Sequence, residues 1–90
     1  MLIEKSNKKD KRYVVTFMDG KKVHFGLKNG STYIDHKDKA KRDAYIARHQ
    51  VREDFNNPYS AGALSRWLLW GDYTSLEKNH QAFMKKFKLK

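Results

Sequence analysis

The sequence predicts a small α+β domain in which an N-terminal β-hairpin packs against a long amphipathic helix and two shorter C-terminal helices. Three observations support this fold class: β-prone runs flank an Asp-Gly pair near the N-terminus, helical spacing begins near residue 36, and two further helical patterns follow. Strand signals that precede helix signals are typical of α+β proteins. We expect a flexible basic arm over residues 1–11 and a single domain over residues 12–90.

Composition limits both the size of the core and the choice of partner. The 90 residues fit one domain with a thin core, and the absence of cysteine excludes disulfides and cysteine-ligated metals. Lys and Arg number 20 against 10 Asp and Glu, which gives a formal net charge of +10. This charge predicts an acidic partner, either nucleic acid, an anionic membrane face or an acidic protein. No signal-peptide pattern or apolar run of membrane-spanning length is present, so we expect a soluble protein.

The N-terminal elements are predicted from composition and turn chemistry. Residues 1–11 are polar and lysine-rich after Met-Leu-Ile, which indicates a flexible arm. The Asp19-Gly20 pair predicts a hairpin, and a three-residue loop with Gly20 in the left-handed conformation is the register that gathers the apolar side chains on one face. That face would contain Tyr13, Val15, Phe17, Val23 and Phe25. A second turn at residues 28–31 allows a third short strand over Thr32–Ile34.

The stretch from His36 to Asp54 predicts the long helix, with Asp35 as its N-cap. Small residues form one stripe on the helical wheel, and we expect it to pack on the hairpin. This stripe comprises Ala40, Ala44, Ala47 and Val51. A basic stripe beside it is then directed outward and is the predicted site for an anionic surface. This second stripe comprises Lys37, Lys41, Arg48 and Arg52.

Two C-terminal helices complete the predicted fold. Pro58 ends the preceding segment, Ser60 is the expected N-cap of the second helix, and Gly71 follows its end. The third helix begins at a capping box from Thr74 to Glu77. Its predicted inward face comprises Leu76, His80, Phe83, Met84 and Phe87.

The segment "SRWLLW" places apolar side chains nearly all round a short helix, more than one thin sheet can cover. The core accounts for Leu64, Trp67 and Leu68, which leaves Leu69 or Trp70 as an exposed anchor for another protein. A neighbouring arginine can pair with an acidic partner or stack on a ring. The predicted protein-contact residues are therefore Arg66, Trp67, Leu69 and Trp70.

Catalytic and metal-binding patterns are not evident. The four histidines lack metal-ligand spacing, and no glycine-rich phosphate loop or nucleophile elbow is present. A nuclease that pairs His36 or His49 with Asp35 or Asp38 is an alternative that the spacing does not require. His49 also lies one helical turn from Tyr45, where it could hydrogen-bond or stack, although we expect a partly exposed structural histidine. We predict no enzymatic activity, no cofactor, no metal and no small-molecule substrate.

Three motifs carry a resemblance over residues 11–87. They are "G-K-x-V-x-F-G" at residues 20–26, "H-K-D…Y-I-x-R-H" at residues 36–49, and "S-R-W-L-L-W" at residues 65–70. The chain resembles a family of small basic proteins, without assigned biochemical function, encoded by large nucleocytoplasmic DNA viruses of algae and protists. It departs from that family at Ala63 and Leu64, where larger residues are usual, and at "GDYTSL", where "N-K-P-T-L" is common. The resemblance carries no catalytic residues.

The resemblance implies a viral context, in which small basic domains commonly serve as capsid-associated or genome-associated components. The first functional hypothesis is a non-enzymatic virion structural protein, a minor capsid or capsid-associated component, located in the virion and in the host cytoplasm or nucleus during infection. Its partners would be other virion or capsid proteins, DNA or RNA backbone, or, less favoured, the inner-membrane surface. The alternative hypothesis is a sequence-independent nucleic-acid-binding protein that uses the basic stripe.

Overall fold

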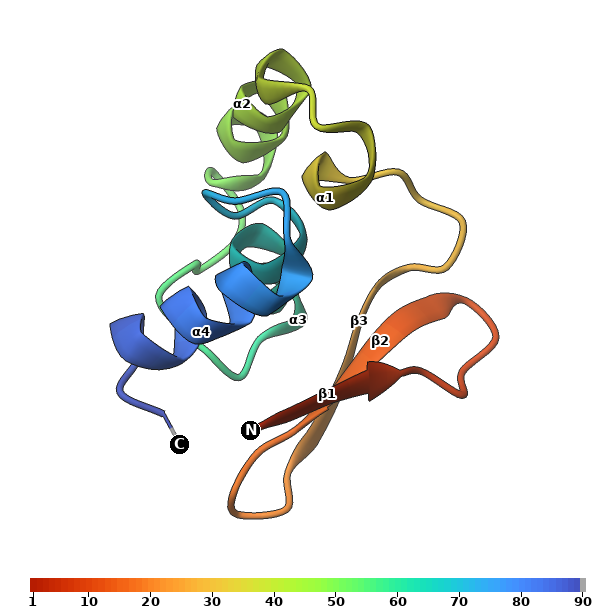
Figure 1. Ribbon diagram of the computed structural model, residues 1–90, viewed down its shortest axis with the longest axis vertical. Coiled ribbons are helices and arrows are strands. Elements are labelled where there is room, and N and C mark those ends of the chain that lie inside the picture. Colours follow the sequence, from red (N-terminus) through yellow and green to blue (C-terminus); the bar gives the residue numbers. More distant parts are fainter. Residues whose placement is uncertain (90) are drawn as a thin grey trace.

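The computed structural model describes residues 1–89 as a three-stranded antiparallel sheet followed by helices, so the α+β class is confirmed (Figure 1). The strand order is β1-β2-β3. In Figure 1 the sheet lies below and to the right, most of the helices lie beside it, and α2 lies at the top. The elements are β1 (Leu2–Lys5), β2 (Lys11–Thr16), β3 (Lys22–Leu27), α1 (Tyr33–His36), α2 (Lys39–His49), α3 (Ala61–Leu64), η1 (Ser65–Leu69) and α4 (Leu76–Lys86).

The predicted hairpin register is confirmed. Tyr13 pairs with Phe25 and Val15 pairs with Val23. The backbone N–H of Phe17 donates to the carbonyl of Lys21 at 2.9 Å, and Gly20 adopts a φ of 88°. A positive φ costs glycine little, so the bulged turn sets the register that places the apolar side chains on one face.

The N-terminus differs from the expected flexible arm. Leu2–Lys5 forms β1, an edge strand in which Ile3 pairs with Val15 and Lys5 pairs with Tyr13. Ile3 packs against the core cluster, so one apolar anchor and a row of backbone hydrogen bonds hold residues that composition alone assigns to solvent. The strand that completes the sheet is therefore β1, at the N-terminus, and not a segment that follows β3.

The segment expected to return as a strand is instead the short helix α1. The carboxylate of Asp35 accepts from the backbone N–H of Thr32 at 2.8 Å and from its hydroxyl at 2.7 Å. These bonds satisfy a donor at the start of the helix, as helix caps do. The expected third strand over Thr32–Ile34 is wrong, and Asp35 belongs to α1 rather than capping a long helix.

The expected long helix over residues 36–54 is also wrong, because the chain divides into α1 and α2 at Lys37. Lys37 adopts a left-handed φ of 59°, and Asp38 then caps α2 by accepting from the backbone N–H of Ala40 at 3.0 Å. The helix ends with the C-cap Gln50 after 11 residues. A residue in the left-handed region ends a helix because it turns the backbone away from the helical path.

The face that α2 directs inward is opposite to the predicted one. The small-residue stripe is exposed, and Val51 retains 75% of its accessible surface. The side chains directed inward are larger and partly polar, namely Arg42, Tyr45, Ile46 and His49. The hairpin packs instead on α3 and η1, through β3. The stripe does not pack on the hairpin because α2 lies beyond the helices that cover the sheet (Figure 1).

The core lies between the sheet and the C-terminal helices. It comprises Val15, Phe17 and Phe25 from the hairpin, Ala63, Leu64, Leu68 and Leu69 from α3 and η1, and Phe83 from α4.

Ser60 caps α3 as predicted, accepting from Ala63 N–H at 3.1 Å. The helix continues as one π-helical turn in which Trp70 N–H donates to the Ser65 carbonyl at 3.0 Å. The N-cap of α4 is Ser75, one residue later than expected, and its predicted inward face is buried or half-buried.

Candidate functional site

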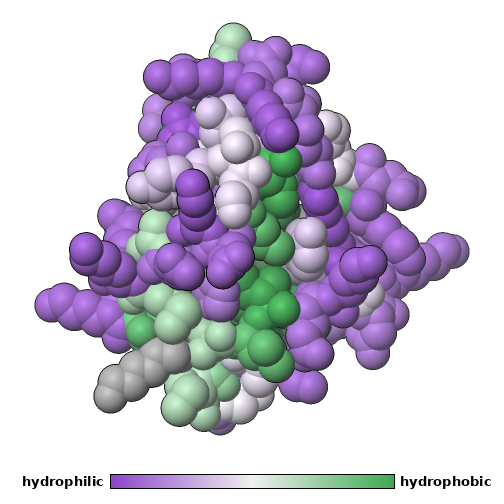
Figure 2. All heavy atoms as spheres, viewed as in Figure 1, coloured by the Kyte–Doolittle hydropathy of each residue, from purple (hydrophilic) through white to green (hydrophobic). Residues whose placement is uncertain are grey.

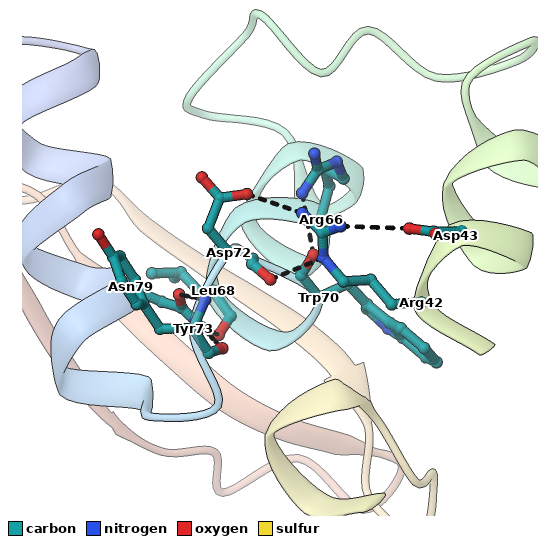
Figure 3. A network of polar contacts seen from close by, with 9 residues as sticks. Arg42, Asp43, Arg66, Leu68, Trp70, Asp72, Tyr73 and Asn79 are labelled. Carbon is teal, nitrogen blue, oxygen red and sulfur yellow. Dashed lines mark hydrogen bonds and ion pairs between the residues drawn. The ribbon is translucent and has the colours of Figure 1, made fainter. Parts of the chain in front are cut away.

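The turn that follows η1, residues 70–73, is held by polar side chains from three helices (Figure 3). From α2, Arg42 donates through Nε to the Gly71 carbonyl at 2.8 Å and through Nη2 to the Asp72 carboxylate at 2.7 Å. Its side chain is only 12% exposed, and its guanidinium lies over the Tyr33 ring at 5.6 Å. A planar guanidinium with several donors suits this geometry, so Arg42 joins α2 to the turn.

Two further side chains hold the turn from its other sides. Arg66 donates to the Trp70 carbonyl at 2.9 Å, and burial and the nearby Arg42 lower its pKa. From α4, the buried Asn79 accepts from the Tyr73 N–H at 3.0 Å and donates to the carbonyls of Leu68 and Tyr73 at 3.0 and 2.9 Å. Both arginines therefore serve the fold, and their charges lie beside each other (Figure 3).

Aromatic rings form a continuous column beside this turn. Trp70 stacks on Tyr45 with centroids 4.2 Å apart, and Tyr45 stacks on His49 at 4.1 Å. The His36 ring contacts the Trp70 ring at 5.3 Å. Burial raises the pKa of Tyr45 to about 12, helped by the charge of Glu53. Of the two contacts that the spacing of Tyr45 and His49 allowed, stacking is the one observed. The column joins α1, α2 and the end of η1.

A cavity of about 400 Å³ lies beside the column, between β3, the following loop, α2 and α3. His49 and Glu53 line it, with Nδ1 and Oε2 3.4 Å apart, and Oε2 has no hydrogen-bond partner. The cavity therefore offers a carboxylate and an imidazole next to aromatic surface. Within residues 1–89, no group of three or more potential ligand side chains is placed to hold a metal ion.

The four residues predicted to meet an anionic surface are exposed, but they do not share one helix. Lys41 and Arg48 lie on α2, Lys37 occupies the turn between α1 and α2, and Arg52 lies in the turn beyond α2. Among the Lys and Arg side chains of the described part of the chain, only Arg12 and Arg42 form ion pairs. The outward charge on and near α2 is therefore not neutralised within the protein. Figure 2 shows hydrophilic atoms over the top and margins of the molecule.

The four residues predicted to contact another protein are largely used within the fold. Leu69 is 1% exposed and belongs to the core, which corrects its expected role as an anchor, and Arg66 is buried. Trp70 is half-buried in the aromatic column. Trp67 is also half-buried and donates through Nε1 to the Phe55 carbonyl at 2.7 Å. Its ring lies near the charges of Arg66, at 4.1 Å, and Lys86, at 4.6 Å. The apolar side chains of this segment that the sheet does not cover pack against α2 and α4.

Sequence reasoning did not identify Arg42, Asp72 or Asn79. One signal was present: Arg42, Tyr45, Ile46 and His49 follow the i, i+3, i+4, i+7 spacing of a single helix face. Because Arg42 and His49 are polar, the sequence indicated that this face is exposed to solvent. Its partners lie about 30 residues further along the chain, so the pairing could not be read from local spacing.

The fold and the surface define a small basic α+β domain with exposed cations on and near α2 and a turn at residues 70–73 that polar side chains hold in place. The sequence model of the family of unknown function DUF5754 matches residues 1–49, more than half of the 90-residue chain. The chain belongs to this family. The matched region spans the sheet, α1 and α2. No curated protein and no solved structure matches the chain. Within residues 1–89, no helix is long and apolar enough to cross a membrane.

Proposed function

We propose that the protein is a small non-enzymatic structural component of a large DNA virus particle, and that it contacts the nucleic-acid backbone without reading base sequence. The viral context rests on the resemblance of three motifs. The mode of contact rests on one observation, namely that Lys37, Lys41, Arg48 and Arg52 are exposed and form no ion pair within the described chain. Such cations release counterions from nucleic acid when they bind phosphates.

The position of α2 supports this proposal. The helix lies at one end of the molecule, and its inward face is occupied by Arg42 and the aromatic column (Figure 1). Its remaining surface is free to approach a phosphate backbone. Lys41 and Arg48 lie two helical turns apart on one side of α2, a rise of roughly 10 Å. Since the phosphates of one strand are spaced by about 3.4 Å along the axis, the two side chains can meet phosphates about three nucleotides apart.

A capsid-lining role through the tryptophan segment has weaker support. Arg66 and Leu69 are buried, and Trp70 is half-buried against Tyr45. Of the four residues predicted to contact another protein, Trp67 and Trp70 keep part of their surface exposed, and the Trp67 ring lies near Lys86. An acidic capsid protein or an anionic membrane surface would meet the same outward cations, so both are outcomes of the test rather than part of the proposal.

The proposal is tested by measuring the affinity for duplex DNA of mixed sequence as a function of salt, using fluorescence anisotropy. The double variant Lys41→Ala, Arg48→Ala should lower the log–log salt slope by about 2 units, at about 0.9 per lost phosphate contact. The matched control Lys78→Ala, Lys85→Ala removes the same charge from α4 and should change the slope far less. Equal effects of the two variants, or no binding by the wild-type protein at low salt, contradict the proposal.

The location of the protein in purified particles tests the viral part of the proposal. We expect it to remain with the genome-containing core after the shell and membrane are removed. Recovery with the shell or the membrane favours an acidic capsid protein or anionic lipid as the partner. Absence from particles excludes a virion component.

A further inference from the structure

A second group of cations meets at the end of the sheet, far from the predicted basic stripe in the sequence. Lys5 ends β1, Lys11 begins β2, and Lys28 follows β3. Antiparallel pairing brings these positions together, since Lys5 lies opposite Tyr13 and Lys11 lies opposite Leu27. Two backbone hydrogen bonds hold the adjoining turns: Lys28 N–H donates to the Asp10 carbonyl at 3.2 Å, and Ser6 N–H donates to the Arg12 carbonyl at 3.0 Å.

These cations surround a concavity of about 370 Å³. Each residue that lines it carries a polar or charged group; they are Lys5, Ser6, Lys11, Arg12, Tyr13 and Lys28. Three separate segments thus bring three lysines to the border of one hollow. A hollow of this kind can surround an anion with several donors, which isolated surface lysines cannot do.

The charge of this hollow is only partly neutralised within the protein. Arg12 is paired with Asp35 through two bonds of 2.7 Å, which leaves the guanidinium a fixed part of the wall. The three lysines form no ion pair within the described chain. The surrounding potential is positive: desolvation lowers the pKa of the nearby His24, and the charges of Lys8, Lys22 and Lys11 lower it further.

We propose that the hollow bounded by Lys5, Lys11 and Lys28 is a phosphate-binding subsite that receives a backbone phosphate of the nucleic acid. This inference rests on the proposed function and adds a second contact point to it. The longest dimension of the molecule is 36 Å, close to the length of one turn of duplex DNA, about 34 Å. One turn of duplex DNA is therefore long enough to span this hollow and the cations of α2. In this proposal the pairing of β1 with β2 has a function, because it places Lys5 at the hollow.

The subsite is tested with the double variant Lys5→Ala, Lys28→Ala. Both side chains are exposed, so the fold should tolerate the change. For duplex DNA at low salt we expect a loss of affinity of roughly 10-fold and a salt slope lower by about 2 units. The control Lys78→Ala, Lys85→Ala carries the same loss of charge and should reduce affinity far less.

A second measurement uses inorganic pyrophosphate and the ¹⁵N-labelled protein in NMR titrations. Saturable shifts should concentrate at the amides of residues 5, 6, 11 and 28 and should disappear in the Lys5→Ala, Lys28→Ala variant. Weak shifts spread over the whole surface, or shifts that persist in the variant, overturn the subsite.

The two proposals fail in different ways. If the variant on α2 lowers the salt slope and the variant at the sheet end does not, the subsite is wrong and the proposed function stands. If the wild-type protein does not bind DNA, the proposed function is wrong, and the pyrophosphate titration alone decides whether the hollow binds phosphate.

Discussion

The rings of Tyr45 and Trp70 lie face to face, with centroids 4.2 Å apart and an interplanar angle of 3°. This contact joins the middle of α2 to the residue that ends η1. Together with the hydrogen bonds of Arg42 to Gly71 and Asp72, it determines which side of α2 faces the protein. The direction in which the exposed cations of α2 point therefore depends on Tyr45 and Arg42, which are not part of the basic surface.

Replacing Tyr45 with alanine should lower the free energy of unfolding by about 2 kcal/mol, because an aromatic stack and its buried area are lost together. Urea denaturation followed by circular dichroism measures the change. The variant Tyr45→Phe retains the stack and should remain within about 0.5 kcal/mol of the wild type. Equal losses for both variants would show that the hydroxyl, not the stack, is important.

Glutamine in place of Ala44 or Ala47 should change stability by less than about 0.5 kcal/mol, since both positions are exposed. If the small-residue stripe packed on the hairpin, a larger polar side chain there would cost several kcal/mol by overpacking and desolvation. Thermal unfolding of the two variants distinguishes these cases. A large loss of stability would show that α2 uses the face predicted from the sequence.

Alanine at Gly71 should destabilise the protein by about 2 kcal/mol or more. A Cβ at this position would meet the Trp67 carbonyl oxygen and would lie 2.7 Å from Asn79 Oδ1. Neither atom can move easily, because one is backbone and the other is held by hydrogen bonds. Denaturant unfolding measures the loss. Gly62→Ala is a useful comparison, since its Cβ would meet the movable carboxylate of Glu53 and should cost less.

Leu69→Ala should cost about 3 kcal/mol, the usual range for a leucine truncated in a core. The side chain is 1% exposed and contacts the close-packed Gly26, whose added Cβ would lie 2.9 Å from Leu69 Cδ1. Chemical denaturation gives the value. An effect on self-association with unchanged stability would instead support the role of an exposed anchor.

The Arg12–Asp35 pair predicts a loss of stability in acid. Hydrogen bonds from Arg12 are the largest cause that holds the pKa of Asp35 well below its usual range, so the folded state stabilises the carboxylate. This contribution is complete above the unfolded-state pKa of about 3.9, and it is lost as the pH falls from there through the lower folded-state pKa.

Asp35→Asn should therefore reduce stability by about 1 kcal/mol at pH 7, and the difference from the wild type should shrink in acid. Unfolding free energies measured between pH 7 and pH 2.5 test this. The control Asp43→Asn removes the carboxylate of a longer and more exposed ion pair, in which Asp43 lies 3.3 Å from Arg42, and should reduce stability less at pH 7. A difference that stays constant with pH would contradict the assignment.

The hairpin shows what local sequence information can predict. Alternation of apolar residues and the Asp-Gly turn are both properties of neighbouring residues, so together they predicted the register, the bulge and the inward face. Ser60 as the cap of α3 was predictable for the same reason. β1 was missed because its pairing depends on β2, beyond an intervening turn, while its own composition is that of a solvated arm.

The orientation of α2 could not be predicted because its partners are distant in the sequence. Hydrophobic spacing favoured the alanine stripe, whereas the contacts of Arg42 and Tyr45 are with Asp72 and Trp70. The exposure predicted for the tryptophan segment was wrong for a related reason. Its apolar side chains pack on α2 and α4 as well as on the sheet, and local spacing does not show those contacts.

The sequence by itself determined the α+β class, the hairpin and the strong positive charge, because these follow from residue type and short-range spacing. Only the tertiary structure decided which side of α2 faces water, that Leu69 is core, and that Lys5, Lys11 and Lys28 surround one hollow. Each of these depends on segments that are far apart in the chain and come together by helix packing and strand pairing. Short-range residue spacing does not predict the energies of such long-range contacts.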